Sequence, residues 1–160
     1  MSKTLESIVE EIILDFHQRN ISKTTPREVV LEPLPNKATV CMGVRRSGKS
    51  TLMMQQIQRL ESSGVLREHM VYINLFDDRL HQLQELGLGI ILDVYYRLFP
   101  HKKGADKVHF FFDELQVIPN WEPFIDRLMR TEICEVYITG SSSQYLSKEI
   151  ATQMSGRALS

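Results

Sequence analysis

The hydrophobic pattern of the N-terminal part predicts one amphipathic helix followed by an extended segment. Apolar residues recur at helical spacing over residues 3–19. Three prolines follow within residues 22–36, and proline favours extended backbone in the residue before it. We therefore expect residues 1–36 to form a helix and an arm that lead into a core domain over residues 37–160.

Short apolar runs alternate with helical patterns through the rest of the chain. Four runs have the length and the content of β-branched and aromatic residues that are typical of buried strands: residues 38–42, 70–75, 107–113 and 135–139. Helical spacing fills the intervals at residues 50–62, 79–99 and 121–129, and a last helix is expected near residues 144–154. Such alternation predicts a parallel sheet covered on both faces, so the fold class is α/β.

Single residues indicate where some of these helices begin and end. Gly64 follows the helix over residues 50–62, in the position that favours a left-handed C-terminal cap. Gly87 and Gly89 interrupt the next helical pattern, which we expect to form in two pieces. Asn120 is a suitable N-cap for the helix that follows it.

The strongest chemical signal lies between the first strand and the next helix. Residues 43–50 read Gly-Val-Arg-Arg-Ser-Gly-Lys-Ser and fit the phosphate-binding pattern G-x-x-x-x-G-K-[ST], the Walker A motif. The glycines let the backbone approach a phosphate closely, beside the positive end of the helix. Lys49 supplies a cation for the β- and γ-phosphates, and the Ser50 hydroxyl can bind Mg²⁺. The pattern predicts a nucleotide site.

An acid pair, Asp113 and Glu114, follows the most apolar strand. Such a pair after a strand is usually a solvated turn. One strand beyond the phosphate loop, however, it suits the Walker B arrangement, in which Asp113 holds Mg²⁺ and Glu114 polarises the attacking water.

Three serines follow the fourth strand: Ser141, Ser142 and Ser143. They can place a polar side chain near the γ-phosphate, or they can cap the next helix. Taken by themselves, they favour the cap.

Together these segments resemble a known family. The set GVRRSGKST, YINLFDD, FFFDELQ, VIPNWE, YITGSSS and MSGR is similar to the uncharacterised prokaryotic AAA-type ATPases related to the archaeal ATPases. In that family the ATPase domain usually precedes a C-terminal domain of unknown function. The resemblance covers residues 37–157 and implies a three-layer P-loop NTPase sandwich of the additional-strand type. It also implies that the fourth strand lies between the first and the third.

The resemblance implies roles for single residues. It assigns the nucleotide to nine consecutive residues: Gly43, Val44, Arg45, Arg46, Ser47, Gly48, Lys49, Ser50 and Thr51. It assigns Mg²⁺ to Asp113 and catalysis to Glu114; the metal role of Ser50 and the catalytic role of Lys49 follow from the phosphate-loop pattern. With the family included, a serine such as Ser141 is favoured as the γ-phosphate sensor over the capping role.

Members of this family continue for hundreds of residues and have at least one further core strand. We therefore expect a truncated ATPase core, incomplete at its C-terminus and weak in turnover. Its first strand is then an open sheet edge, which favours self-association unless the arm around residues 28–31 covers it.

Composition and charge argue against some classes of binding partner, namely nucleic acids and membranes. Lys and Arg total 19 and Asp and Glu total 20, so the chain lacks the overall basic field of a dedicated nucleic-acid-binding domain. Its apolar runs are far shorter than the roughly 20 residues of a membrane span. Acidic residues within the first helix argue against an export signal. We expect a cytoplasmic protein without a membrane partner.

Several basic residues leave two interpretations open. Arg45 and Arg46 can contact phosphate or a neighbouring subunit, or can be solvated. Arg157 suits an arginine finger in a homo-oligomer, although a plain surface arginine is favoured. The basic loop over residues 101–107 is expected to be solvated rather than to contact DNA. The five histidines form no recognisable ligand set, so no metal besides Mg²⁺ is expected.

The leading functional hypothesis is Mg²⁺-dependent ATP binding with hydrolysis in the complete protein, coupled to an unknown output. ATP is preferred over GTP because the sequence contains no Asn-Lys-x-Asp segment. The alternative is an ATP-regulated binding module with negligible turnover, which contacts a protein or DNA partner through a missing C-terminal region. A small-molecule kinase is less favoured because no Arg-rich lid is evident.

Overall fold

The computed structural model describes residues 3–21, 38–41, 46–140 and 151–154. Within them, five parallel strands form one sheet in the order β2-β3-β4-β1-β5. The strands are β1 (Ala38–Cys41), β2 (Met70–Asn74), β3 (Val108–Asp113), β4 (Cys134–Thr139) and β5 (Ala151–Met154). The predicted order is confirmed, because β4 lies between β1 and β3.

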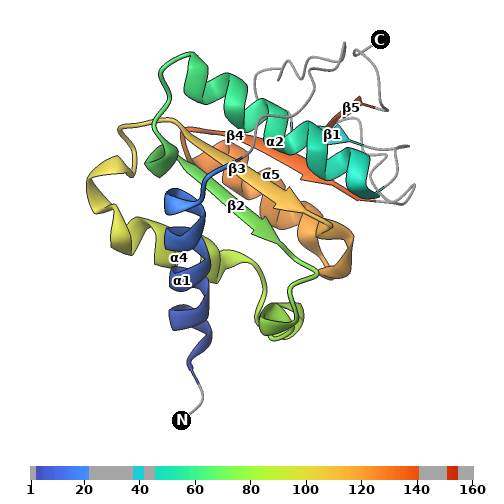
Figure 1. Ribbon diagram of the computed structural model, residues 1–160. Coiled ribbons are helices and arrows are strands. Elements are labelled where there is room, and N and C mark those ends of the chain that lie inside the picture. The colour runs from blue at the N-terminus through green and yellow to red at the C-terminus, as the bar shows by residue number, and fades with distance from the viewer. Residues whose placement is uncertain (1–2, 22–37, 42–45, 141–150, 155–160) are drawn as a thin grey trace.

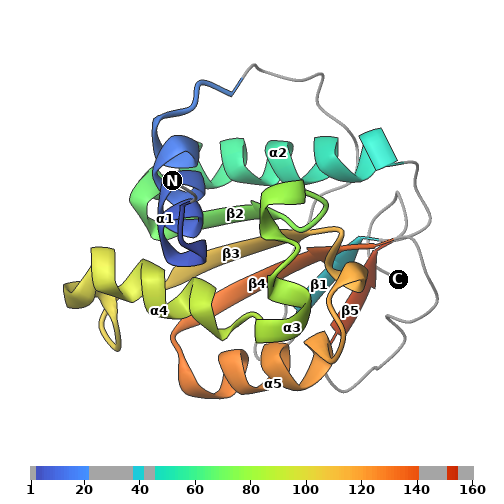
Figure 2. The same ribbon diagram turned by 90° about the horizontal axis from the view of Figure 1, so that it is seen from below.

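Helices cover both faces of this sheet and produce the expected three layers (Figures 1 and 2). The α-helices are α1 (Leu5–Gln18), α2 (Arg46–Ser62), α3 (Leu83–Leu86), α4 (Gly89–Leu98) and α5 (Trp121–Thr131). In the described part of the chain, four short 3-10 helices connect these elements: Arg67–His69, Asp78–Leu80, Pro100–Lys102 and Leu115–Val117. In Figure 2, α2 lies on one side of the sheet and α4 and α5 lie on the other.

Alternate residues of the buried strands face the two helical layers. In β3, Phe111 packs with Tyr137 and with the apolar side chains of α2, such as Leu52. Its neighbours Phe110 and Phe112 belong to the larger cluster that includes α4 and α5. All six residues of β3 are buried, which confirms that the aromatic run belongs to the core.

The N-terminal helix α1 shares this core. Val9 and Ile13 are fully buried in the same cluster as residues of the strands, and Phe16 joins the cluster on the α2 side. Thr4 begins the helix by accepting a hydrogen bond from the Ser7 N–H at 3.1 Å. The linking arm over residues 22–37 lies outside the described residues, so the domain boundary at residue 36 stays a prediction.

Some element ends match the expectation and others differ. Gly64 has φ +106° and, with Val65, bonds back to the last turn of α2, as a left-handed cap requires. Gly87, with φ +84°, separates α3 from α4. Helix α2 begins at Arg46, four residues before the expected start, although Gly48 costs a helix roughly 1 kcal/mol relative to alanine. Asn120 precedes α5 but makes no side-chain cap.

Two predictions about the C-terminal part are wrong. Ala151–Met154 is a strand, where the sequence predicts the end of a helix over residues 144–154. This strand pairs in parallel with β1 over residues 38–41, so β1 is not an open edge. Ladder hydrogen bonds with β1 decide the conformation, which local periodicity could not reveal. The self-association expected from an open β1 edge therefore loses its basis.

Candidate nucleotide site

The carboxyl ends of the central strands bring Asp113 and Thr139 to the edge of the sheet at which α2 starts. Asp113 is the last residue of β3, and Thr139 is the last residue of the neighbouring strand β4. The first turns of α2, which contain Gly48, Lys49 and Ser50 in their backbone, start at the same end of the sheet (Figures 1 and 2). Open α/β sheets bind ligands at this edge.

Asp113 is a buried carboxylate held by two hydroxyl groups. Its side chain is 1% exposed. The Tyr72 hydroxyl donates to Oδ2 at 2.5 Å, and the Thr139 hydroxyl donates to Oδ1. Its backbone carbonyl also accepts the Leu75 N–H at 2.9 Å. A carboxylate that is buried needs such donors, because an unpaired charge in the interior is costly.

Glu114 turns the chain sharply at the end of β3. Its backbone lies in the left-handed region, with φ 58° and ψ 47°, which costs a non-glycine residue about 1 kcal/mol or more. Two hydrogen bonds hold it there: the Glu114 N–H donates to Thr139 Oγ1 at 2.9 Å, and Gln116 Nε2 donates to Glu114 Oε1 at 3.0 Å. Strained backbone of this kind is common at functional sites.

Two hydroxyl-bearing residues of this site, Thr139 and Tyr72, were not identified from the sequence. Thr139 accepts from the Glu114 backbone and donates to Asp113, so one hydroxyl connects both members of the acid pair. Tyr72 reaches Asp113 from β2. Both belong to segments quoted for the family resemblance, but their contacts depend on strand order and register, which the sequence does not display.

Several residues that the sequence assigns to the site lie outside the part of the chain that the structure describes. Residues 43–45 of the phosphate loop and the serines Ser141, Ser142 and Ser143 lie outside the described residues, as does Arg157. The roles predicted for them, and for the side chains of Lys49, Ser50 and Thr51, stay predictions.

The basic loop over residues 101–107 is not simply solvated, which corrects the sequence interpretation. Lys102 is 5% exposed, and its Nζ lies 2.8 Å from His69 Nε2. Lys103 pairs with Glu132 at 2.9 Å, and Lys107 pairs with Glu135 at 3.1 Å. The three lysines of this loop thus have partners within the same chain.

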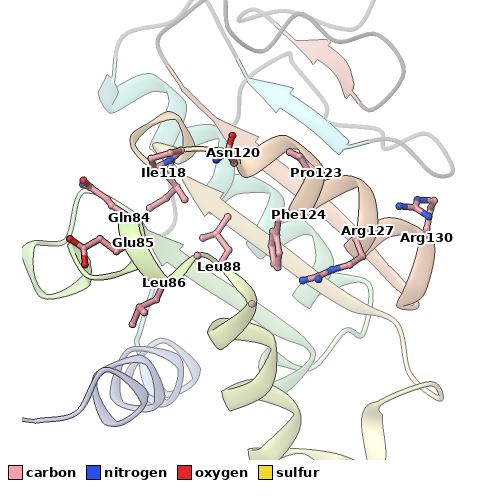
Figure 3. A pocket seen from close by; sticks show the side chains of 13 residues that line it. Gln84, Glu85, Leu86, Leu88, Ile118, Asn120, Pro123, Phe124, Arg127 and Arg130 are labelled. Carbon is pink, nitrogen blue, oxygen red and sulfur yellow. The ribbon is translucent and has the colours of Figure 1, made fainter.

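A groove of about 570 Å³ lies between the α3–α4 junction and α5 (Figure 3). Leu88 and Phe124 face one another across it, and Arg127 reaches along its wall with its guanidinium 5.7 Å from the Phe124 ring. A second hollow of about 590 Å³ extends from Gln116 to Pro123. Neither hollow is lined by the acid pair, and Asp113 and Glu114 are both buried.

Comparison with known proteins agrees with this architecture. Residues 35–160 match the family model AAA_14, an AAA domain. The chain belongs to this family. AAA domains of this kind are P-loop ATPases, so membership implies nucleotide binding and indicates ATPase activity.

Relatives of the chain are longer proteins. An uncharacterised protein of Methanocaldococcus jannaschii, MJ1544, is 35% identical over 153 residues, which is 95% of this chain and 32% of that protein. An uncharacterised protein of Haemophilus influenzae is 32% identical over 120 residues, or 74% of this chain and 28% of its own length. The chain thus spans about a third of the length of these relatives.

A solved structure supports the fold. The structure of C. elegans PCH-2 aligns with 98% of this chain and 41% of its own, with a TM-score of 0.51 and 13% sequence identity. At this identity the likeness is one of fold. The P-loop NTPase fold predicted from the sequence is confirmed. In the described part of the chain, none of the helices combines the length and apolar character that crossing a membrane requires.

Proposed function

We propose that the chain binds ATP together with Mg²⁺, and that the complete protein hydrolyses ATP to ADP and phosphate. The observation that carries the proposal is the strand order, in which β4 separates β1 from β3. In this order the start of α2, the Asp113–Glu114 pair and Thr139 lie at one sheet edge. A phosphate loop and an acid pair in this relation are the parts that phosphoryl transfer requires.

The residues of the site fit Mg²⁺. Mg²⁺ prefers oxygen ligands and keeps several of its waters, and Asp113 presents a buried carboxylate among hydroxyl groups. We propose that Asp113 and Ser50 hold the ion. When bound, it would neutralise charge on the β- and γ-phosphate oxygens. Lys49 and the backbone of residues 43–51 bind the phosphates.

Glu114 is the candidate that polarises the attacking water. It is 3% exposed, and its Oε1 is held by the Gln116 amide. Its left-handed backbone and its bond to Thr139 set the direction of its side chain relative to Asp113. Ser141 is proposed as the γ-phosphate sensor, because it follows Thr139 by two residues in the sequence and the family resemblance favours that role. A preorganised general base of this kind contributes about 10²–10⁴-fold to a rate.

Two substitutions separate binding from turnover. Lys49→Ala removes the cation predicted at the β- and γ-phosphates, so we expect at least about a tenfold loss of affinity for a fluorescent ATP analogue. Glu114→Gln should retain binding and abolish phosphate release. The exposed Lys3→Ala and Glu122→Gln are matched controls that should leave both unchanged.

The outcomes distinguish the alternatives. Equal affinity of folded Lys49→Ala and wild type would contradict the proposed site. Tight binding without phosphate release in the full-length protein would favour an ATP-regulated binding module over an ATPase. A homo-oligomer, and a protein or DNA partner bound through the rest of a longer protein, are further predictions of the family resemblance.

A further inference from the structure

Tyr72 reaches the candidate metal ligand from the edge of the sheet. It is the third residue of β2, and in the parallel register it lies opposite Phe111, two residues before Asp113. Its hydroxyl nevertheless donates to Asp113 Oδ2 at 2.5 Å. The ring must therefore lean along the strand toward the carboxyl end, where the nucleotide site is proposed.

This contact completes a clamp on the carboxylate. Thr139 from β4 donates to Oδ1, and Tyr72 from β2 donates to Oδ2. Three adjacent strands thus determine how the Asp113 carboxylate is oriented. Tilting the plane of the carboxylate about its last torsion angle would weaken both hydrogen bonds together.

The Tyr72 ring is supported in turn by the end of α1. Its centroid lies 5.7 Å from that of Phe16. The Arg19 guanidinium carbon lies 5.6 Å from the Tyr72 ring centre and 5.7 Å from the Phe16 ring centre. A guanidinium over two aromatic faces at this distance is a favourable cation–π arrangement.

Arg67 fixes this end of α1 to the rest of the molecule. Its Nη1 donates to the backbone carbonyls of Phe16 at 2.9 Å and Arg19 at 2.8 Å. Its other nitrogens form two hydrogen bonds with the Glu61 carboxylate of α2, at 3.0 and 2.9 Å. Contacts therefore run without a break from α2 and α1, through the Tyr72 ring, to Asp113.

We propose that Tyr72 is a positioning residue that orients the Asp113 carboxylate toward Mg²⁺, and that the end of α1 holds Tyr72 in place for this task. The inference rests on the proposed function. Tyr72 acts through Asp113 and touches neither nucleotide nor metal in this role. The N-terminal helix is thereby part of the support of the nucleotide site.

The test compares Tyr72→Phe with the wild-type 160-residue chain. Binding of a fluorescent ATP analogue is titrated at increasing Mg²⁺ and also in EDTA, and thermal unfolding is followed in parallel. We expect the Mg²⁺ concentration for half-maximal binding to rise by about tenfold, because one hydrogen bond to a charged group is lost. Affinity in EDTA should stay within about twofold.

Two further variants sharpen the result. Tyr137→Phe removes another hydroxyl on the same face of the sheet, which bonds Gln56 and Glu135, and should leave the Mg²⁺ midpoint unchanged. Phe16→Leu keeps the hydroxyl of Tyr72 but weakens the support of its ring, and should raise the midpoint by a smaller factor.

Each outcome bears on the inference. An unchanged Mg²⁺ midpoint in Tyr72→Phe, while Lys49→Ala still loses affinity, overturns it and leaves the proposed function intact. An equal loss of affinity with and without Mg²⁺ would show that Tyr72 only stabilises the fold, and also overturns it. An unchanged Mg²⁺ midpoint in Phe16→Leu would show that α1 does not hold Tyr72 in place for this task. Failure of the wild type to bind nucleotide overturns both proposals.

Discussion

At the residue scale, the single hydroxyl group of Thr139 holds both members of the acid pair. Its hydroxyl oxygen accepts a hydrogen bond from the Glu114 N–H at 2.9 Å, and its O–H group donates a hydrogen bond to Asp113. A hydroxyl can do both at once because it carries one donor and two acceptor lone pairs. Threonine is also stiff about its first side-chain torsion angle, so the bridge is held with little loss of conformational freedom.

Replacing this hydroxyl should destabilise the protein. Thr139→Val leaves the buried Glu114 N–H without its acceptor, and we expect a loss of about 1–3 kcal/mol in the free energy of unfolding, measured with denaturant. Thr139→Ser should recover most of it. Thr39, on β1, is a matched control: it is fully buried, and within the described residues its hydroxyl has no hydrogen-bond partner.

Thr39→Val should accordingly leave the stability unchanged or raise it. If Thr139→Val and Thr39→Val had the same effect, the bridge between Glu114 and Asp113 would contribute nothing measurable.

At the scale of elements, the pairing of β3 with β4 carries a charged contact outside the site. His109 and Glu135 lie opposite each other in the register, with 3.0 Å between Nδ1 and Oε1. Burial by itself raises the pKa of Glu135, but hydrogen bonds with His109 and Lys107 outweigh burial and bring the pKa down to about 2. The ionised carboxylate therefore helps to hold the two strands together.

This pair predicts how stability depends on pH. A carboxylate whose pKa falls from 4.5 to about 2 on folding contributes stability that is fully present above pH 4.5 and is lost as the pH falls toward 2. In Glu135→Gln this part of the loss should be absent. Between pH 5 and pH 2.5 we expect the free energy of unfolding of the wild type to fall by on the order of 2 kcal/mol more than that of Glu135→Gln.

Denaturant unfolding across this pH range measures the effect, with the exposed Glu122→Gln as control. Parallel curves for wild type and Glu135→Gln would contradict the prediction.

At the scale of the whole molecule, nucleotide binding and folding should be linked. The proposed site draws on the start of α2 and the ends of β3 and β4, which are elements far apart in sequence. A ligand that binds only when these elements are assembled stabilises the folded state by mass action.

Thermal unfolding tests this link. At a hundredfold excess over the dissociation constant, ATP with Mg²⁺ should add about 2.7 kcal/mol and raise the unfolding midpoint by roughly 5–10 °C. Removing Mg²⁺ with EDTA should abolish most of the shift, and Lys49→Ala should show little shift at the same concentrations. An equal shift in Lys49→Ala would place the nucleotide elsewhere.

The sequence by itself determined the fold class, four of the five strands in the described residues, and the motifs of the site. Local rules sufficed for these features. A buried parallel strand such as β3 reads as a continuous apolar run, the glycine spacing of residues 43–50 reflects what a phosphate demands of the backbone, and Gly64 ends α2 because it tolerates positive φ. The strand order followed from the family resemblance and not from the periodicity.

Only the tertiary structure decided the features that depend on partners distant in sequence. Ala151–Met154 is a strand because β1 offers it a ladder of hydrogen bonds. Lys102 is buried, and its ammonium group lies against His69, which comes from an earlier part of the chain. Tyr72 and Thr139 hold Asp113 because β2 and β4 flank β3 in the sheet. Hydrogen bonds between elements leave no periodic trace in the chain, so the support of the acid pair became visible only once the strands were in place.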